Sequence, residues 1–196
     1  VAGQMLPDTG GIGYIRIASF SERTAEEFRE AYQALESEGV KGMIIDLREN
    51  PGGLVTSCVE VANLLVPKGP VVSVVQRDGT KEEYDSELAE AKYPLVVLID
   101  GNSASASEIL AGALQDTGAA TLVGEKSYGK GSVQVVLPLY DDDALKLTIA
   151  KYYTPSGRSI DGTGIEPDVA VTLQGDDTAD EQLLKAIDVM KGKLAG

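Results

Sequence analysis

Residues 94–110, PLVVLIDGNSASASEIL, are the stretch of sequence that decides the fold. The segment from Pro94 to Asp100 is short, apolar and rich in valine and leucine, which is typical of a strand. Gly101 and Asn102 then form a turn. Residues 103–116 follow with apolar positions at helical spacing. The stretch therefore predicts a strand, a tight turn and a helix in immediate succession.

Strands and helices alternate over the rest of the chain. Period-two and short apolar runs predict further strands over 12–20, 42–48, 71–76, 120–123, 132–140, 145–153 and 169–173. Amphipathic patterns predict helices over 24–40, 54–66 and 180–194, the first opened by a capping box between Thr24 and Glu27. With 196 residues and 43% hydrophobic content, we expect a single α/β domain covering residues 1–196.

The composition excludes several classes of function. The formal net charge is -14, which repels a nucleic-acid backbone or an anionic membrane surface. The chain has no histidine and a lone cysteine, Cys58, so it offers no zinc-site spacing and no intrachain disulfide. We expect Cys58 to be a packing residue, and we expect neither a metal nor a cofactor.

The absence of histidine also narrows the chemistry available to the serine run. Ser105 falls just inside the predicted helix, where unpaired N–H groups and the helix dipole stabilise negative charge. A serine nucleophile here needs a carboxylate or a neutral lysine as its base. Lys130, between Gly129 and Gly131, is one candidate, and strand alternation places Gln134 on the same side. Taken singly, however, Ser105 is more simply a helix cap and Lys130 a surface lysine.

The glycine-rich loop has a second interpretation. Residues 124–130 match the first seven positions of a phosphate-binding loop. The eighth position is Gly131 rather than the serine or threonine that holds magnesium, and a strand follows where such a loop requires a helix. These departures disfavour nucleotide binding.

Taken together, these motifs resemble the carboxyl-terminal processing (tail-specific) protease family. The resemblance covers nearly the whole chain and rests on residues 46–53, 103–116, 124–134, 153–160 and 164–168. It implies that Ser105 is the nucleophile, Lys130 the base and Gln134 its support. It also implies an oxyanion hole formed by the backbone N–H groups of Gly53 and Ala106.

The resemblance implies more about fold and role. It implies a core like those of crotonase and Clp protease, and a serine endopeptidase that cuts unstructured C-terminal polypeptide tails. Asp116 matches a supporting position. The PDZ domain of the family and its dimerising helices are absent, so we expect a catalytic core, with any homo-oligomer formed in a longer protein. Family members act in a periplasm, at a cell envelope or in a plastid lumen.

Two alternatives remain open. In the first, the core is a catalytically silent ligand- or peptide-binding module. In the second, it carries out acyl-thioester chemistry on the same scaffold. No cofactor-recognising motif supports the second, and likeness of fold alone is a weak argument for function. If Lys130 is the base it must be neutral, so its pKa must fall from about 10.4 through burial in an apolar site.

Overall fold

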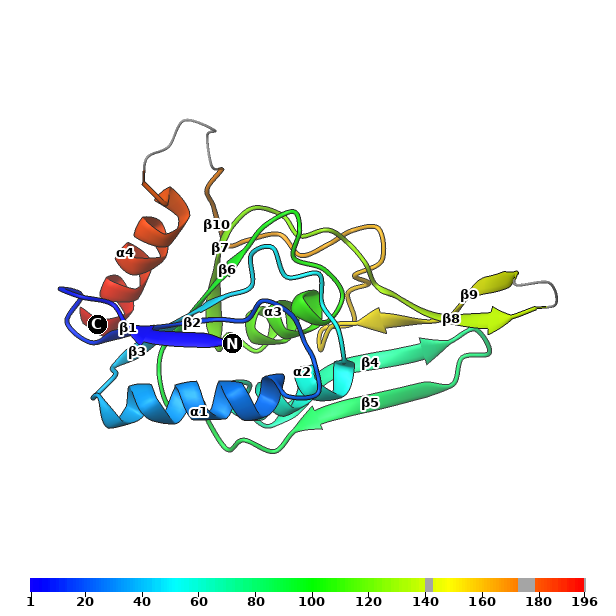
Figure 1. Cartoon of the computed structure of the whole chain (residues 1–196), viewed down its shortest axis with the longest axis horizontal. Coiled ribbons are helices and arrows are strands. Elements are labelled where there is room, and N and C mark those ends of the chain that lie inside the picture. Colours follow the sequence, from blue (N-terminus) through cyan, green and yellow to red (C-terminus); the bar gives the residue numbers. More distant parts are fainter. Residues whose placement is uncertain (140–142, 173–178, 196) are drawn as a thin grey trace.

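A six-stranded sheet forms the centre of the protein (Figure 1). The computed structural model describes residues 1–139, 143–172 and 179–195. The strands lie in the spatial order β1 (Ala2–Met5), β2 (Ile12–Arg16), β3 (Gly42–Asp46), β6 (Leu95–Ile99), β7 (Ala120–Gly124) and β10 (Val169–Ala170). β1 runs antiparallel to β2, and every other neighbouring pair is parallel. Parallel strands must be covered on both faces, because their connections pack helices there.

Helices cover both faces of this sheet. α1 (Thr24–Ser37), α2 (Val55–Ala62) and α3 (Ala106–Asp116) share one apolar cluster with strand side chains such as Ile45. α4 (Glu181–Ala195) covers the other face, where Met190 packs in one cluster with Ile44. α1 and α4 accordingly lie on opposite sides of the sheet in Figure 1. β3 and β6 are buried along their whole length, and the α/β prediction is confirmed.

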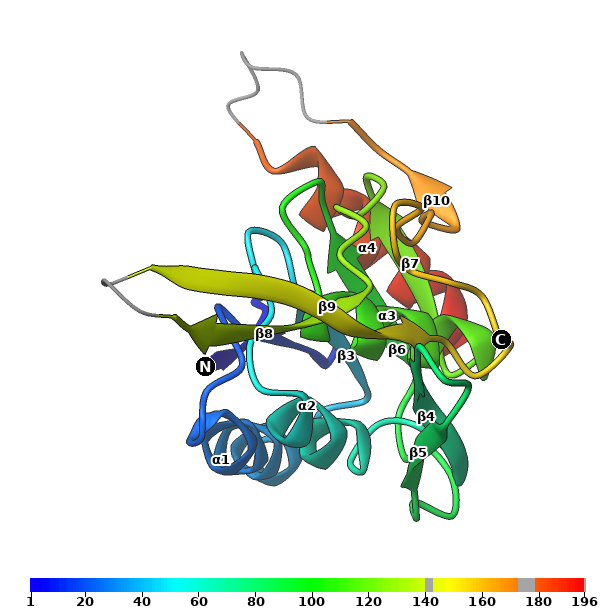
Figure 2. The ribbon, with the colours of Figure 1, turned by 90° about the vertical axis from the view of Figure 1, so that its right-hand side faces the viewer.

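A second, antiparallel sheet lies beside the first. Its spatial order is β5 (Lys81–Ser86), β4 (Gly69–Gln76), β9 (Ala144–Tyr153) and β8 (Ser132–Pro138). β8 and β9, both predicted as strands, pair as a hairpin that projects from the body of the protein (Figures 1 and 2). The hairpin exposes a set of large apolar side chains, namely Val136, Leu137, Leu139, Leu145, Leu147 and Ile149.

Two strands, β1 and β5, were not predicted from the sequence patterns. β5 is polar along most of its length because it forms an outer strand of its sheet, and β1 exposes three of its four residues. The predicted capping box at Thr24 is also wrong: its hydroxyl donates to Ser19 O at 3.0 Å and accepts from Ser21 N at 2.9 Å. The predicted ends of two strands, at Tyr140 and Leu173, lie outside the described residues.

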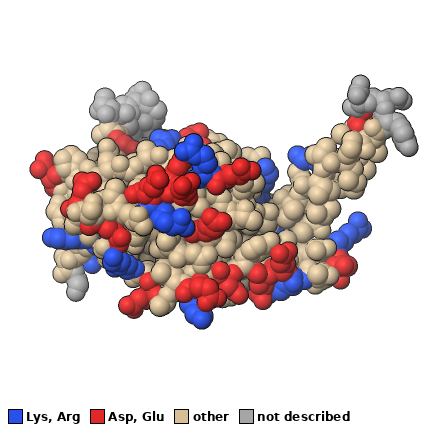
Figure 3. Space-filling view, turned by 60° about the horizontal axis from the view of Figure 1, so that its bottom comes forward, with Lys and Arg blue, Asp and Glu red and all other residues tan. Residues whose placement is uncertain are grey.

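Acidic side chains are spread over the face shown in Figure 3, interrupted by single basic ones. This distribution agrees with the net charge of -14. Cys58 is fully buried in the core, and burial raises the pKa of its thiol, so it packs as predicted. No helix in the described part of the chain has the length and hydrophobicity needed to span a bilayer.

Candidate active site

The serine run forms a strained turn at the start of α3. Ser105 precedes the helix with φ 56° and ψ -115°, a sparsely populated conformation for a residue with a side chain. Such a conformation costs about 1–3 kcal/mol and persists only where its surroundings hold it. Here the Ser105 N–H donates to a carboxylate oxygen of Glu108 at 2.8 Å. The strain marks Ser105 as the distinctive residue of the turn.

The two flanking serines have structural roles. The Ser103 hydroxyl donates to Leu47 O at 2.8 Å, and the Ser107 hydroxyl donates to Asn50 O at 3.0 Å. Both serines are fully buried, whereas Ser105 is half-buried. Their bonds fasten the serine run to the loop that follows β3. Of the three serines, Ser105 is therefore the one accessible to a polypeptide.

The loop that follows β3 packs directly against the serine turn. Gly52 has φ +96°, and a methyl group built on it would lie 2.8 Å from Ser105 Cβ and 2.9 Å from Ala106 N. Only glycine permits so close an approach at this backbone conformation. The loop is held in turn by Asn50, whose side-chain oxygen accepts the Gly52 N–H at 2.9 Å.

The two predicted oxyanion donors make no hydrogen bond to the rest of the described chain. Within the described residues, neither the Gly53 N–H nor the Ala106 N–H donates a hydrogen bond. Gly53 adjoins Gly52, which contacts the turn that carries Ala106. Unpaired N–H groups fixed by the backbone are what an oxyanion hole requires. The oxyanion role of Gly53 and Ala106 stays a prediction.

Glu108 joins the serine turn to the loop that carries Lys130. Its carboxylate is fully buried and accepts four hydrogen bonds. The donors are Ser105 N at 2.8 Å, Ser127 Oγ at 2.5 Å, Gly129 N at 2.6 Å and Lys130 N at 2.8 Å. A carboxylate offers about four lone-pair positions, so this one is fully used. One side chain thus fixes both halves of the candidate site.

Glu108 was not predicted as a site residue from the sequence, although a signal was available. Serine followed three residues later by glutamate, as in Ser105 and Glu108, is the pattern of a capping box. The same pattern at Thr24 and Glu27 forms no capping box. At Ser105 the pattern places the Glu108 carboxylate at the helix start, where it also accepts the Lys130 N–H.

Lys130 and Gln134 do not lie as the sequence suggested. Lys130 is exposed rather than buried in an apolar site. Gln134 is exposed as well, and its amide donates to Thr148 Oγ1 at 3.4 Å. Among the described residues, no hydrogen bond connects the side chains of Ser105, Lys130 and Gln134. The structure therefore brings the two loops together but not the three side chains.

A bulge in the hairpin accompanies this difference. Val133 pairs with Ala150 and Gln134 pairs with Thr148, which leaves Ile149 without a partner in β8. A bulge changes the twist of a hairpin and re-aims its side chains. The prediction that Gln134 lies on the same side as Lys130 assumed simple alternation along β8, without this bulge. β8 also excludes the phosphate-binding loop, because a strand rather than a helix follows residues 124–131.

Asp116 lies at the far end of α3 from Ser105, about 16 Å along a helix of this length. Its carboxylate accepts the Ser156 N–H at 2.9 Å and pairs with Arg158. Burial favours its neutral form, but hydrogen bonds from Thr154 and Ser156 outweigh burial and hold the pKa of Asp116 below its usual range. Asp116 therefore supports the turn at residues 154–158 rather than the serine turn.

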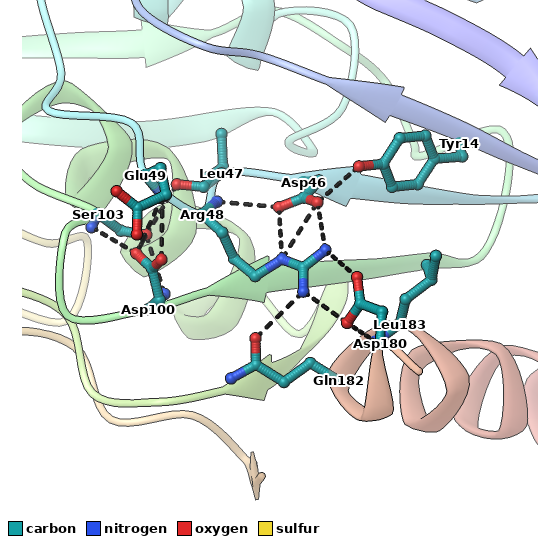
Figure 4. Close-up of polar contacts among 10 residues, drawn as sticks. All are labelled: Tyr14, Asp46, Leu47, Arg48, Glu49, Asp100, Ser103, Asp180, Gln182 and Leu183. Atoms are coloured by element: carbon teal, nitrogen blue, oxygen red, sulfur yellow. Dashed lines mark hydrogen bonds and ion pairs between the residues drawn. The ribbon is translucent and has the colours of Figure 1, made fainter. Parts of the chain in front are cut away.

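An ion-pair network anchors the loop after β3 (Figure 4). The Arg48 guanidinium contacts Asp46 at 2.7 Å and Asp180, just before α4, at 2.7 Å. Asp46 is fully buried and also accepts the Tyr14 hydroxyl at 2.6 Å. Burial is the larger cause, and this hydrogen bond the next, of a raised pKa for the Tyr14 hydroxyl. Planar guanidinium and carboxylate groups give such pairs a fixed geometry.

A second carboxylate joins this loop to the serine turn. The Glu49 N–H, at a residue with φ 59°, donates to both side-chain oxygens of Asp100 at 3.1 Å. Asp100 Oδ1 also accepts the Ser103 N–H at 2.9 Å. Asp100 therefore holds the start of the glycine loop against the start of the serine run, as shown on the left of Figure 4.

Comparisons with known proteins show which family the chain is similar to. The model of a peptidase family, family S41, matches residues 11–171. A carboxy-terminal-processing protease from Bartonella bacilliformis is 46% identical over 169 residues, covering 83% of this chain and 39% of that protein. A chloroplastic C-terminal processing peptidase from Tetradesmus obliquus is 39% identical over 160 residues, covering 81% of this chain and 34% of that protein.

A solved structure, the photosystem II D1 C-terminal processing protease, has a TM-score of 0.78 and 34% identity, covering 97% of this chain and 50% of that one. The chain thus spans half or less of the length of these relatives. The match in sequence includes the glycine loop, the serine turn and the lysine loop, and the match in structure covers almost every described element. The chain belongs to peptidase family S41.

Proposed function

We propose that this chain is the catalytic core of a serine endopeptidase that cuts unstructured C-terminal polypeptide tails. One observation carries the proposal: the buried Glu108 carboxylate ties the Ser105 turn to the Lys130 loop. The names of the relatives, which are carboxy-terminal-processing proteases, support the substrate class.

The proposed mechanism uses the chain's own residues. A neutral Lys130 amine takes the proton of the Ser105 hydroxyl, and the oxygen attacks the scissile carbonyl. The N–H groups of Gly53 and Ala106 hold the resulting oxyanion. Lys130 returns the proton to the leaving amine, and the C–N bond breaks. Water then hydrolyses the acyl-enzyme, with Lys130 again as base.

On this proposal, the arrangement of Ser105, Lys130 and Gln134 in the structure is an inactive, resting state of the site. Lys130 is exposed and Gln134 is held by Thr148, so neither is placed for the first step. Catalysis requires the end of the β8–β9 hairpin next to the Lys130 loop to shift. The Lys130 amine would then be removed from solvent and would reach Ser105. Gln134 would then exchange Thr148 for the lysine amine.

Incubation with an unfolded protein tests the activity. Mass spectrometry should find fragments and an acyl adduct on Ser105. Cleavage should disappear in Ser105→Ala and Lys130→Met but persist in Ser103→Ala and Ser107→Ala variants that circular dichroism shows to be folded. Activity should also rise with pH, because only the neutral amine accepts a proton. Loss in Ser103→Ala with full activity in Ser105→Ala would overturn the assignment.

A silent peptide-binding module is the second candidate, favoured by the exposed Lys130. It predicts retention of an unfolded polypeptide without fragments or adduct, in wild type and Ser105→Ala alike. The same incubation therefore separates the two candidates.

Two further proposals concern the longer protein. The chloroplastic relative supports a location outside the cytoplasm, namely a periplasm, a cell envelope or a plastid lumen, which cell fractionation tests. A homo-oligomer, formed by segments beyond this core, is tested by light scattering on the longer protein.

A further inference from the structure

A cleft of about 550 Å³ opens beside the serine turn. Its lining comes from the glycine loop, the serine run, the lysine loop and the hairpin, and consists of Glu49, Pro51, Asn102, Ala104, Tyr128, Lys130 and Lys146. Lys146 belongs to β9, where it pairs across the hairpin with Val136. A polypeptide segment that reaches Ser105 through this cleft therefore passes two lysines.

The cleft is less acidic than the protein as a whole. Its lining includes two lysines and a single carboxylate, that of Glu49. Glu49 already accepts the Asn102 side-chain amide at 2.8 Å. The chain as a whole carries a net charge of -14, which repels acidic polypeptides. The Lys146 ammonium group in the cleft lining offsets that repulsion at the place where substrate must enter.

Lys146 has no counter-ion among the residues that the structure describes. Other lysines near the site do have one: Lys151, on the same strand, pairs with Asp161 at 2.9 Å, and Lys126 pairs with Glu166 at 2.7 Å. The chain neighbours of Lys146, Leu145 and Leu147, are exposed apolar residues. Within the described ranges, Lys146 thus presents an ammonium group without a counter-ion, between two exposed apolar side chains.

The two cleft lysines have different requirements. As the proposed base, Lys130 must be neutral to take a proton, and a neutral amine holds no anion. Lys146 enters no step that needs it neutral, so its ammonium group stays free to bind a carboxylate through three N–H donors. One lysine can therefore serve the reaction while the other serves recognition.

We propose that Lys146 is a specificity-determining residue that binds a carboxylate of the polypeptide being cut. The inference rests on the proposed function, because the carboxylate must arrive on a chain that reaches Ser105. The carboxylate comes either from the free C-terminus of the tail or from an acidic side chain near the cut. Both sources share the chemistry that an unpaired ammonium group recognises.

Matched peptides test the proposal and separate the two sources. The first pair has one sequence and ends in a carboxylate or an amide. The second pair is amidated and differs only by glutamate or glutamine near the cut. Wild type should favour the carboxylate member of at least one pair by about three- to tenfold in kcat/KM, mainly through KM. Raising the salt concentration should shrink the preference, because salt screens exposed charges.

Two variants complete the design. Lys146→Met keeps the apolar stem and removes the charge, so the carboxylate peptide should fall to the level of its amide or glutamine partner. Lys191→Met, on the exposed face of α4 across the sheet, makes the same change in net charge and should keep the wild-type preference. Equal rates within both pairs for wild type, or an unchanged preference in Lys146→Met, would overturn the proposal.

Binding separates this inference from the proposed function. Fluorescently labelled versions of the four peptides are titrated with Ser105→Ala protein, with and without Lys146→Met, and anisotropy is recorded. If wild type cuts none of the peptides, the proposed function fails. A carboxylate preference in binding that Lys146→Met removes still supports the inference, and binding without such a preference refutes it.

Discussion

Glu108 accepts the backbone N–H of Lys130 at 2.8 Å, so the helix that begins after the proposed nucleophile also fixes the loop of the proposed base. The two residues are 22 positions apart in the chain. Local sequence therefore cannot hold the loop, and a buried carboxylate does so instead. Removal of its charge should affect the reaction more than the fold.

We expect Glu108→Gln to lower kcat by about 100-fold, as for a displacement of about 1 Å at a reacting group. An amide has a single acceptor oxygen, so its NH₂ group must face N–H donors such as those of Gly129 or Lys130. Steady-state kinetics on an unfolded protein measures the effect. Glu60→Gln, on an exposed position of α2, is the control. Wild-type kcat in Glu108→Gln would contradict the positioning role.

Gly52→Ala should abolish cleavage, because the added methyl group would lie 2.8 Å from Ser105 Cβ. Gly39 provides a matched control: its φ is +80°, close to the +96° of Gly52, but nothing lies within 4 Å of its added methyl group. Gly39→Ala should lose about 1 kcal/mol of stability and keep its activity. Kinetics and thermal unfolding of both variants separate steric contact at the site from backbone strain. Equal activity in the two variants would show that the close approach is irrelevant.

The Arg48 network should make stability depend on pH. Burial favours the neutral form of Asp180, but hydrogen bonds from Arg48 outweigh it and hold the pKa of Asp180 below its usual range. A carboxyl with a lowered folded-state pKa stabilises the fold above its unfolded pKa of about 3.9, and this is lost as pH falls through the folded value.

Urea unfolding of wild type and Asp180→Asn between pH 7 and pH 3 measures that contribution. Wild type should be more stable at pH 7 by less than about 1 kcal/mol, because the carboxylate is partly exposed. The two curves should converge towards pH 3. A constant difference across this range would show that the carboxylate contributes no pH-dependent term.

Two buried serines should respond oppositely to replacement by alanine. In the described part of the chain, Ser57 Oγ is buried without a hydrogen-bond partner. Ser86 Oγ, also buried, donates to Val66 O at 2.7 Å and accepts from Leu88 N at 3.2 Å. Ser57→Ala should raise the free energy of unfolding by about 1 kcal/mol, and Ser86→Ala should lower it by about 1–3 kcal/mol. Chemical denaturation checks both signs, and a destabilised Ser57→Ala would reveal a hidden partner.

The sequence predicted the elements whose burial leaves a periodic signal. The apolar runs of β3 and β6 and the faces of α1 and α4 follow directly from hydrophobic spacing. β5 left no such signal, because the residues KEEYDS belong to an outer strand that is largely exposed. The position of Ser105 at a helix start was predictable from the turn before it.

The rest of the site depends on contacts between distant segments. The link from Glu108 to Lys130 spans two elements, and periodicity within one element carries no trace of it. The placement of Gln134 depends on an unpaired residue in the partner strand, Ile149, which no pattern in β8 records. Tertiary placement therefore decides which of the predicted residues meet.

The bond between Arg48 and Asp180 also sets an order of events during synthesis. The two residues are 132 positions apart, so Arg48 leaves the ribosome long before its partner. Until then, the loop that carries Gly52 and Gly53 lacks one of its anchors. A nascent chain thus completes the anchoring of its candidate catalytic centre only late in translation.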